Sequence, residues 1–251
     1  MQHSLPEHYH TLPPFRDLFS KGVPILMYHK IASRPSRVRL KGLYVTPANF
    51  IRQLTELKEN GFVSCGLAEA CQDGATAPRV ALTFDDGFRN VVQNAMEPLN
   101  RGRWRALQFL VPSCLGHLNQ WDLRDGEVAE ALMDAAQVRD WLGAGHAIGS
   151  HSLTHARLTR LTQRDAREEI FASKKKLEDT FGVAVEHFCY PYGDWNEAVR
   201  ELVMEAGYRT ACTTEFGVNT PATPPFTLHR ITVRHPTRTL RSLKRRLLES
   251  L

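Results

Sequence analysis

Short runs of apolar residues alternate along the chain with longer segments in which apolar residues recur at helical spacing. Runs of about four to eight apolar residues are typical of buried β-strands. The chain contains strand candidates of this kind at residues 23–28, 79–84, 105–111, 146–150, 185–190, 208–213 and 226–233. Most of them are apolar at nearly every position, as expected for strands that are covered on both faces.

Start and stop signals for helices fall between these strands. Thr46, followed by a proline, predicts the start of a helix within residues 46–61 that ends at a glycine. Thr162, with an acidic residue three positions later, resembles a capping box and predicts a helix over residues 162–182. A third helix is predicted over residues 194–207. The repeated strand-then-helix order predicts an α/β fold whose parallel sheet is closed or nearly closed into a barrel.

Length and composition place the chain among globular proteins with one domain. Its 251 residues are 42% hydrophobic and 24% charged, which excludes disordered and fibrous classes. We expect a loosely ordered lead-in over residues 1–20, one domain over residues 21–237 and a basic amphipathic helix over residues 238–251. This helix is expected to pack on the domain, with weak association with a membrane surface as the alternative.

Charge and cysteine content restrict the partners and the compartment. The net charge is +5 and the basic residues are scattered except within residues 238–246, so no nucleic-acid partner is predicted. Five cysteines without a C-x-x-C spacing argue against a disulfide framework. We find no signal-peptide pattern and no run of about 18 apolar residues that would span a membrane. The cytoplasm is therefore the expected location, and nothing in the sequence indicates the oligomeric state.

Two motifs carry candidate chemistry. Asp85 and Asp86 follow the predicted strand at residues 79–84, although Asp-Gly is also a common turn pair. His151 and His155 would face one way if their segment turned helically, although two surface histidines also reach this spacing by chance. Together, two imidazoles and one carboxylate make a metal site with open coordination positions, and the second carboxylate could take a proton from water. The residues alone do not decide which aspartate has which role.

The motifs TFDDG, HSLTH and FCYPYG occur in this order, which resembles the polysaccharide deacetylases of carbohydrate esterase family four, the NodB-homology family. The resemblance covers about residues 23–233. It implies a distorted (β/α)7-type barrel in a single domain. It also implies metal-dependent hydrolysis of the amide bond of an N-acetylated amino sugar, with Asp85 as the general base.

The same resemblance implies roles for the other motif residues. Asp86, His151 and His155 would bind a divalent metal, which is zinc or alternatively cobalt, nickel or iron. Tyr192 would donate its backbone N–H to the oxyanion of the tetrahedral intermediate. Many family members carry an arginine where this chain has Cys189, and that arginine orients the base aspartate.

Four further residues are candidates for the site. Arg230 has either a structural role or pairs with Asp85 in place of the missing arginine. Contact with the substrate is an additional possibility for Arg230 and His229. Trp121 and Trp195 would stack on a sugar face or else pack in the core.

The departing sugar nitrogen needs a proton, and a histidine is suited to supply it. Many family members use a histidine of a late Leu-x-His motif, whereas here His229 directly follows Leu228. The early segment PILMYH resembles instead a branch that includes poly-β-1,6-N-acetylglucosamine deacetylases, in which the acid is the early histidine. His29 is therefore the candidate acid, and His229 is the alternative.

The predicted function is N-deacetylation of an amino sugar in a polysaccharide, such as an exopolysaccharide, or in a glycan precursor. One alternative is a deformylase or amidase that uses the same scaffold for a non-polymeric substrate. Another is a carbohydrate-binding protein with impaired catalysis. The cysteine at position 189 favours this last alternative slightly, and the complete set of Asp and His residues opposes it.

Overall fold

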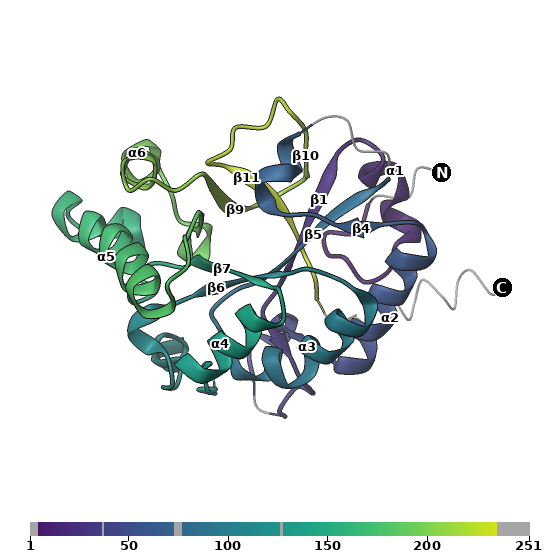
Figure 1. The fold of residues 1–251 in the computed structure, drawn as a ribbon, viewed down its shortest axis with the longest axis horizontal. Coiled ribbons are helices and arrows are strands. Elements are labelled where there is room, and N and C mark those ends of the chain that lie inside the picture. Colours follow the sequence, from purple (N-terminus) through teal and green to yellow (C-terminus); the bar gives the residue numbers. More distant parts are fainter. Residues whose placement is uncertain (1–4, 37, 73–76, 126–127, 235–251) are drawn as a thin grey trace.

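Parallel strands form a closed barrel in the computed structural model, which describes residues 5–36, 38–72, 77–125 and 128–234. The barrel strands are β1 (Val23–Tyr28), β5 (Arg79–Phe84), β6 (Leu107–Leu110), β7 (Ala147–Ser150), β8 (His187–Cys189), β9 (Thr210–Phe216) and β11 (Leu228–Thr232). They follow one another in this order, and β1 pairs with both β5 and β11, which closes the sheet (Figure 1). The predicted single-domain barrel of seven parallel strands is therefore confirmed.

Helices cover the outside of this barrel (Figure 1). The longer ones are α2 (Pro47–Glu59), α3 (Arg89–Gly102), α4 (Ala135–Gly143), α5 (Gln163–Phe181) and α6 (Glu197–Glu205). The Thr46 and Thr162 side chains accept hydrogen bonds from backbone N–H groups of the first turns of α2 and α5, which confirms both predicted starts. The sequence-based prediction omits α3 and α4, although the capping box of Asp134 and Gln137 would have located α4.

Short elements complete the chain. The remaining strands are β2 (Lys30–Ile31), β3 (Tyr44–Val45), β4 (Val63–Ser64) and β10 (Val218–Asn219), and the remaining α-helix is α1 (Arg16–Phe19). The 3₁₀ turns are η1 (Pro13–Phe15), η2 (Lys41–Leu43), η3 (Leu67–Cys71), η4 (Pro112–Cys114), η5 (Gln120–Asp125), η6 (Leu158–Arg160) and η7 (Pro191–Gly193).

The prediction of a loosely ordered lead-in over residues 1–20 is wrong for residues 5–20. Tyr9, Phe15 and Phe19 are buried and pack against one another, and Tyr9 forms a bridge with Val233 beyond β11. Polar residues and prolines separate these aromatic residues in the sequence, so no apolar run reveals the packing. The predicted helix over residues 238–251 lies outside the described residues. Within the described part of the chain, no helix has the length and apolar character needed to cross a membrane.

The interior of the barrel is apolar toward the amino ends of its strands and polar toward their carboxyl ends. Side chains from six of the seven strands form one buried cluster, which η3 joins through Leu67 and Ala70. Neighbouring residues along β1 alternate between this cluster and the larger core that the helices cover, as expected for a strand with two buried faces. Buried polar residues follow the carboxyl ends of β1, β5 and β7, where the candidate site lies.

Candidate active site

The two aspartates lie in a tight turn directly after β5. Asp86 has a left-handed backbone with φ of 75°, and Gly87 follows with φ of 80°. The side chains of Asp85 and Asp86 are nevertheless almost fully buried, with 2% and 5% of each residue exposed. The Asp-Gly pair is therefore both a turn and part of a buried polar site, and the strained conformation at Asp86 is of the kind that clusters at functional sites.

The histidine pair comes from the loop after β7. This loop is not helical, because Ser152 and His155 have left-handed backbones with φ of 60° and 67°. The His155 backbone N–H donates to the Ser152 hydroxyl, which holds the loop closed. Both imidazoles nevertheless face Asp86, whose Oδ1 lies 3.4 Å from His151 Nε2 and 3.2 Å from His155 Nε2.

Asp86, His151 and His155 form a donor set that fits a divalent cation. Their ligand atoms lie within 4.8 Å of one another. His151 Nδ1 lies 2.8 Å from the carbonyl oxygen of Cys189, which can only accept, so Nδ1 carries a proton. Nε2 faces Asp86 and would present its lone pair to a cation after releasing its own proton. Burial opposes ionisation of Asp86, but hydrogen bonds from both histidines hold its pKa well below the ordinary value of 3.8. The carboxylate is thus available as an anionic ligand.

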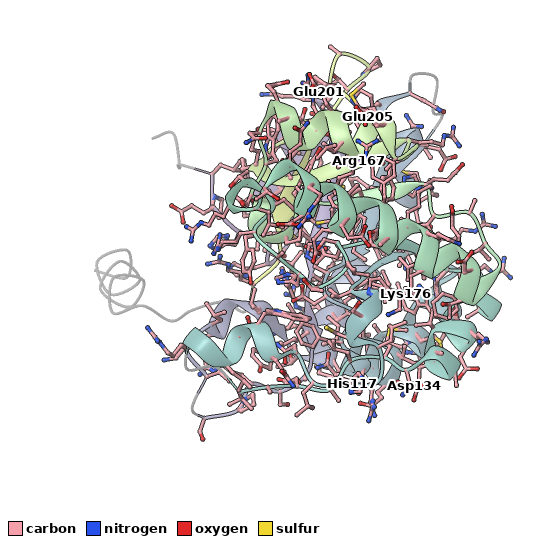
Figure 2. The ribbon with its side chains drawn as sticks, turned by 90° about the vertical axis from the view of Figure 1, so that its left-hand side faces the viewer. His117, Asp134, Arg167, Lys176, Glu201 and Glu205 are labelled. Carbon is pink, nitrogen blue, oxygen red and sulfur yellow. The ribbon has the colours of Figure 1, made fainter. Side chains whose placement is uncertain are left out.

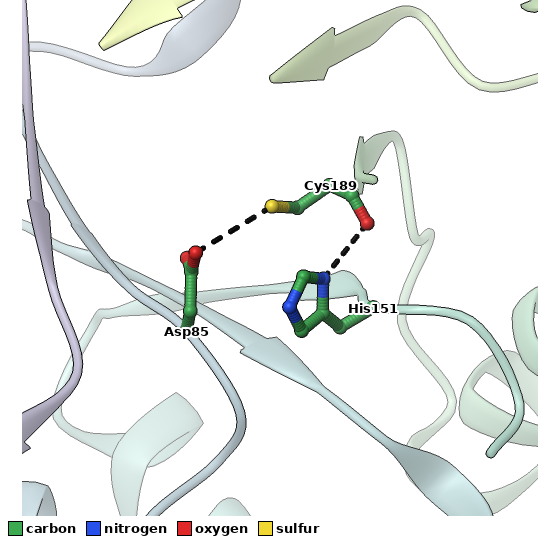
Figure 3. A group of neighbouring side chains, drawn as sticks. All are labelled: Asp85, His151 and Cys189. Atoms are coloured by element: carbon green, nitrogen blue, oxygen red, sulfur yellow. Dashed lines mark hydrogen bonds between the residues drawn. The ribbon is translucent and has the colours of Figure 1, made fainter. Parts of the chain in front are cut away.

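A second group of possible ligands, Asp85, His151 and Cys189, lies beside the first (Figure 3). The guanidinium of Arg230 contacts two of its members, because Nη2 lies 3.1 Å from Cys189 Sγ and 2.8 Å from Asp85 Oδ2. A metal cation at this position would lie next to another cation. The Asp86 group is therefore the better metal site.

Arg230 pairs with Asp85, which lies 145 positions earlier in the sequence. Its Nη1 and Nη2 donate to the two carboxylate oxygens at 2.7 and 2.8 Å, and its Nε donates to the Thr213 carbonyl. Of the two roles considered for Arg230, the structure shows pairing with Asp85. Arg230 is only 1% exposed, which is incompatible with direct contact with a substrate. Burial opposes ionisation of Asp85, but the charges of Arg230, His151 and His29 keep its pKa below 3.8.

We expect Arg230→Met to destabilise the fold by about 3–5 kcal/mol near neutral pH, because it leaves the buried Asp85 carboxylate without its partner. Since the pKa of Asp85 is lowered in the folded state, the stabilisation by the pair is complete above about pH 4 and is lost as the pH falls through that pKa. Urea unfolding measures the effect. The double variant Arg230→Met with Asp85→Asn should lose much less stability than Arg230→Met alone. If both variants lose the same stability, the loss comes from packing instead.

His29 also lies close to Asp85. It follows β1, its side chain is 15% exposed, and its Nε2 lies 4.0 Å from Asp85 Oδ2. The Asp85 backbone N–H donates to the Tyr28 carbonyl, which holds the two strand ends together. His229 lies elsewhere, since neighbouring residues on a strand point to opposite sides and Arg230 points to Asp85. The His229 ring lies 3.7 Å from Glu215, so the alternative acid is not brought to the site.

Aromatic side chains surround His155. The Trp121 ring stacks on the imidazole with a centroid distance of 4.4 Å, and the Tyr192 ring lies 4.6 Å away on an edge. Both residues line a cleft of about 990 Å³ next to His155. Tyr192 has a left-handed backbone with φ of 62°. Trp195 stacks instead on Tyr190 against the core, so of the two tryptophans the structure places Trp121 near the site.

The sequence-based search missed a buried lysine that supports this arrangement. Lys30 is fully buried, with Nζ 4.5 Å from the centroid of the Phe88 ring and 3.9 Å from Asp122 Oδ2. Asp122 follows Trp121 in η5 and also accepts a hydrogen bond from Asn119. The turn that carries Trp121 is thus anchored to the chain segment that carries His29. The sequence feature that could have revealed Lys30 is its position directly after an apolar strand and the histidine that ends it.

The chain is similar in sequence to polysaccharide deacetylases. Residues 72–211 match the family model described as polysaccharide deacetylase. The chain is 28% identical to the putative polysaccharide deacetylase YxkH of Bacillus subtilis over 216 residues, which cover 84% of this chain and 71% of that protein. It is 28% identical over 129 residues to the peptidoglycan-N-acetylglucosamine deacetylase PgdA of Listeria monocytogenes, which is 51% of this chain and 24% of PgdA.

The fold also resembles a solved structure. The crystal structure of the putative polysaccharide deacetylase BA0330 from Bacillus anthracis matches with a TM-score of 0.73 at 27% identity. The match covers 86% of this chain and 66% of that structure. The chain therefore spans most of YxkH, about two thirds of BA0330 and about a quarter of PgdA.

Proposed function

Because the chain belongs to the polysaccharide deacetylase family, we propose that it hydrolyses the acetamide of an N-acetylated amino sugar in a polysaccharide or a glycan precursor, with the help of a divalent metal. The observation that carries this proposal is the convergence of two kinds of group at one end of the barrel. Asp86, His151 and His155 offer metal ligands, and Asp85 lies beside them, close to both Arg230 and His29.

Asp86, His151 and His155 would hold the cation, for which zinc is our first choice, with cobalt, nickel or iron as alternatives because these ligands do not discriminate sharply. When bound, such a cation supplies Lewis-acid activation of the acetyl carbonyl and of the attacking water. We assign the proton transfers to two other residues. Asp85, which Arg230 keeps ionised, takes a proton as the water oxygen attacks the acetyl carbon. His29 gives a proton to the nitrogen as the C–N bond breaks, which leaves acetate and a free amine.

The backbone N–H of Tyr192 is our candidate donor to the oxyanion that forms on the acetyl oxygen. The η7 turn places Tyr192 next to His155, with 4.6 Å between the ring centroids. A donor that is already in position contributes about 2.7–4 kcal/mol of transition-state stabilisation in enzymes of this chemistry.

With His29 as the acid, we also propose that the chain belongs to the branch with an early catalytic histidine. The position of His29 at 4.0 Å from Asp85, and of His229 near Glu215 instead, supports this assignment. We expect His29→Ala to lower turnover by about 10² to 10⁴, the usual worth of a positioned general acid. Metal content should remain unchanged, because His29 is not among the proposed ligands.

The pH dependence of kcat/KM tests the same assignment. A general acid must be protonated, so the activity should fall as the pH rises through the pKa of His29. Burial lowers this pKa below 6.5, although Asp85 and Asp86 oppose the shift, so the fall should begin at a lower pH than an exposed histidine would give. The fall should disappear in His29→Ala and persist in His229→Ala. The opposite pattern would make His229 the acid.

The function itself is tested by mass spectrometry of sugars incubated with the metal-loaded protein. We expect loss of acetyl from N-acetylglucosamine oligosaccharides or glycosyl phosphates. Turnover of formylated amino sugars or cyclic imides alone would favour the deformylase or amidase alternative. Binding of sugars without any turnover would favour the alternative of a carbohydrate-binding protein with impaired catalysis. That alternative was favoured by the missing arginine at position 189, but Arg230 contacts Asp85 in its place.

A further inference from the structure

The cleft next to His155 has a basic lining. Of the described residues that line it, none is Asp or Glu, whereas Arg157, Arg160 and His117 belong to its wall. Arg157 immediately precedes η6 and Arg160 ends it. Side chains three residues apart in a 3₁₀ turn lie on the same side, which explains why both arginines reach the same cleft.

These two arginines are also unpaired, unlike their neighbours. Within the described ranges, no carboxylate oxygen lies within 4.0 Å of a guanidinium nitrogen of Arg157 or Arg160. On the adjacent α5, by contrast, Arg164 contacts Asp165 and Arg167 contacts Glu205 at 2.5 Å. Figure 2 shows the latter pair between α5 and α6. Both unpaired side chains are exposed and therefore accessible to a ligand in the cleft.

Arg157 is held in a defined orientation. Its guanidinium carbon lies 3.8 Å from the centroid of the Tyr192 ring. A guanidinium over an aromatic face leaves the N–H groups of its edge available for an acceptor, and these match the oxygens of phosphate or carboxylate. Tyr192 and His155 lie side by side, so this donor edge is close to the proposed metal site.

The acidic residues around this loop are engaged with other groups. Glu169 accepts hydrogen bonds from the backbone N–H and the hydroxyl of Thr154, and Asp194 accepts from both groups of Thr159. Asp134, labelled near His117 in Figure 2, caps α4. A further cation, Lys176 of α5, donates to Ser113 in the cleft wall at 3.4 Å.

We infer that the cleft binds an anionic group that is part of the substrate, namely a phosphate or a carboxylate on or next to the N-acetylated sugar. This inference rests on the proposed deacetylase function and specifies its substrate class. Uncharged glycans such as chitin fragments would leave the two guanidinium groups without acceptors. A glycosyl phosphate or an acidic sugar would supply those acceptors.

The test compares kcat/KM on three substrates at low ionic strength. They are neutral chitotetraose, N-acetylglucosamine 1-phosphate, and a disaccharide of N-acetylglucosamine and N-acetylmuramic acid, which carries a carboxylate. We expect at least one anionic substrate to be preferred over the neutral one, and the better of the two identifies the anion. The preference should weaken at high salt, because screening reduces attraction at exposed charges.

Variants at position 160 connect this preference to the cleft. Arg160→Gln should lower the ratio of anionic to neutral kcat/KM about tenfold, the usual worth of one charge-assisted hydrogen bond. Arg160→Lys should retain part of the ratio. Arg164→Gln is the matched control, because Arg164 is exposed, pairs with Asp165 and does not line the cleft. It should leave the ratio unchanged.

The outcomes separate this inference from the proposed function. Equal use of neutral and anionic substrates, or a ratio unaffected by Arg160→Gln, would overturn the anionic subsite while the deacetylase function stands. Release of acetate from none of the sugars would instead contradict the proposed function. In that case, calorimetry measures binding of the same sugars. Binding of an anionic sugar that is lost in Arg160→Gln would support the anionic subsite, and the absence of such binding would overturn it.

Discussion

The Asp86→Ala, His151→Ala and His155→Ala variants are each expected to lose the bound metal and with it nearly all turnover. The donor set offers three protein ligands, so each removal leaves only two. We expect metal affinity to fall by more than about 100-fold, since changes in residues that merely orient a ligand already reduce it about 10- to 100-fold. Elemental analysis of dialysed protein measures this without reference to activity.

Two controls make this experiment specific. Cys189→Ser should retain the metal, because Cys189 belongs to the neighbouring group that Arg230 already occupies. His229→Ala should retain it as well, since its ring lies near Glu215 and away from the proposed ligands. Full occupancy in all three ligand variants would refute the metal site, and selective loss in Cys189→Ser would move it to the group shown in Figure 3.

The Asp85→Asn variant is expected to keep its metal and to lose turnover by about 10² to 10⁴, the usual worth of a positioned general base. An amide has nearly the same shape as the carboxylate but cannot accept the proton from water. It also cannot accept both hydrogen bonds of the Arg230 guanidinium, so the variant should be less stable as well.

Stability and chemistry are separated by measuring turnover well below the unfolding transition of the variant. Single-turnover kinetics on the preferred sugar give the rate of the chemical step. Turnover close to that of the parent, with full metal content, would mean that another group accepts the proton.

Local patterns in the sequence determine a large part of this protein. The barrel strands and the starts of α2 and α5 follow from apolar runs and capping residues, which depend on neighbours a few positions away. Asp85 and Asp86 follow a buried strand, and polar residues at the carboxyl end of a barrel strand lie at the end of the barrel where functional sites form. Their pattern and that of the two histidines indicate a metal site before any coordinates are considered.

Only the tertiary structure decides which distant residues meet. Arg230 pairs with Asp85 across 145 positions because β1 lies between β5 and β11 when the barrel closes, and no local pattern encodes that contact. The histidine loop converges on Asp86 through left-handed residues, where spacing alone suggested a helical turn.

The same limit applies to burial and charge away from the motifs. Tyr9, Phe15 and Phe19 are separated in the sequence by polar residues and prolines, and they become core only when the lead-in packs beside β11. Arg157 and Arg160 resemble any other surface arginines in the sequence. Their unpaired charge next to His155 emerges from the fold, because whether a charge finds a partner depends on side chains that the folded chain brings near it.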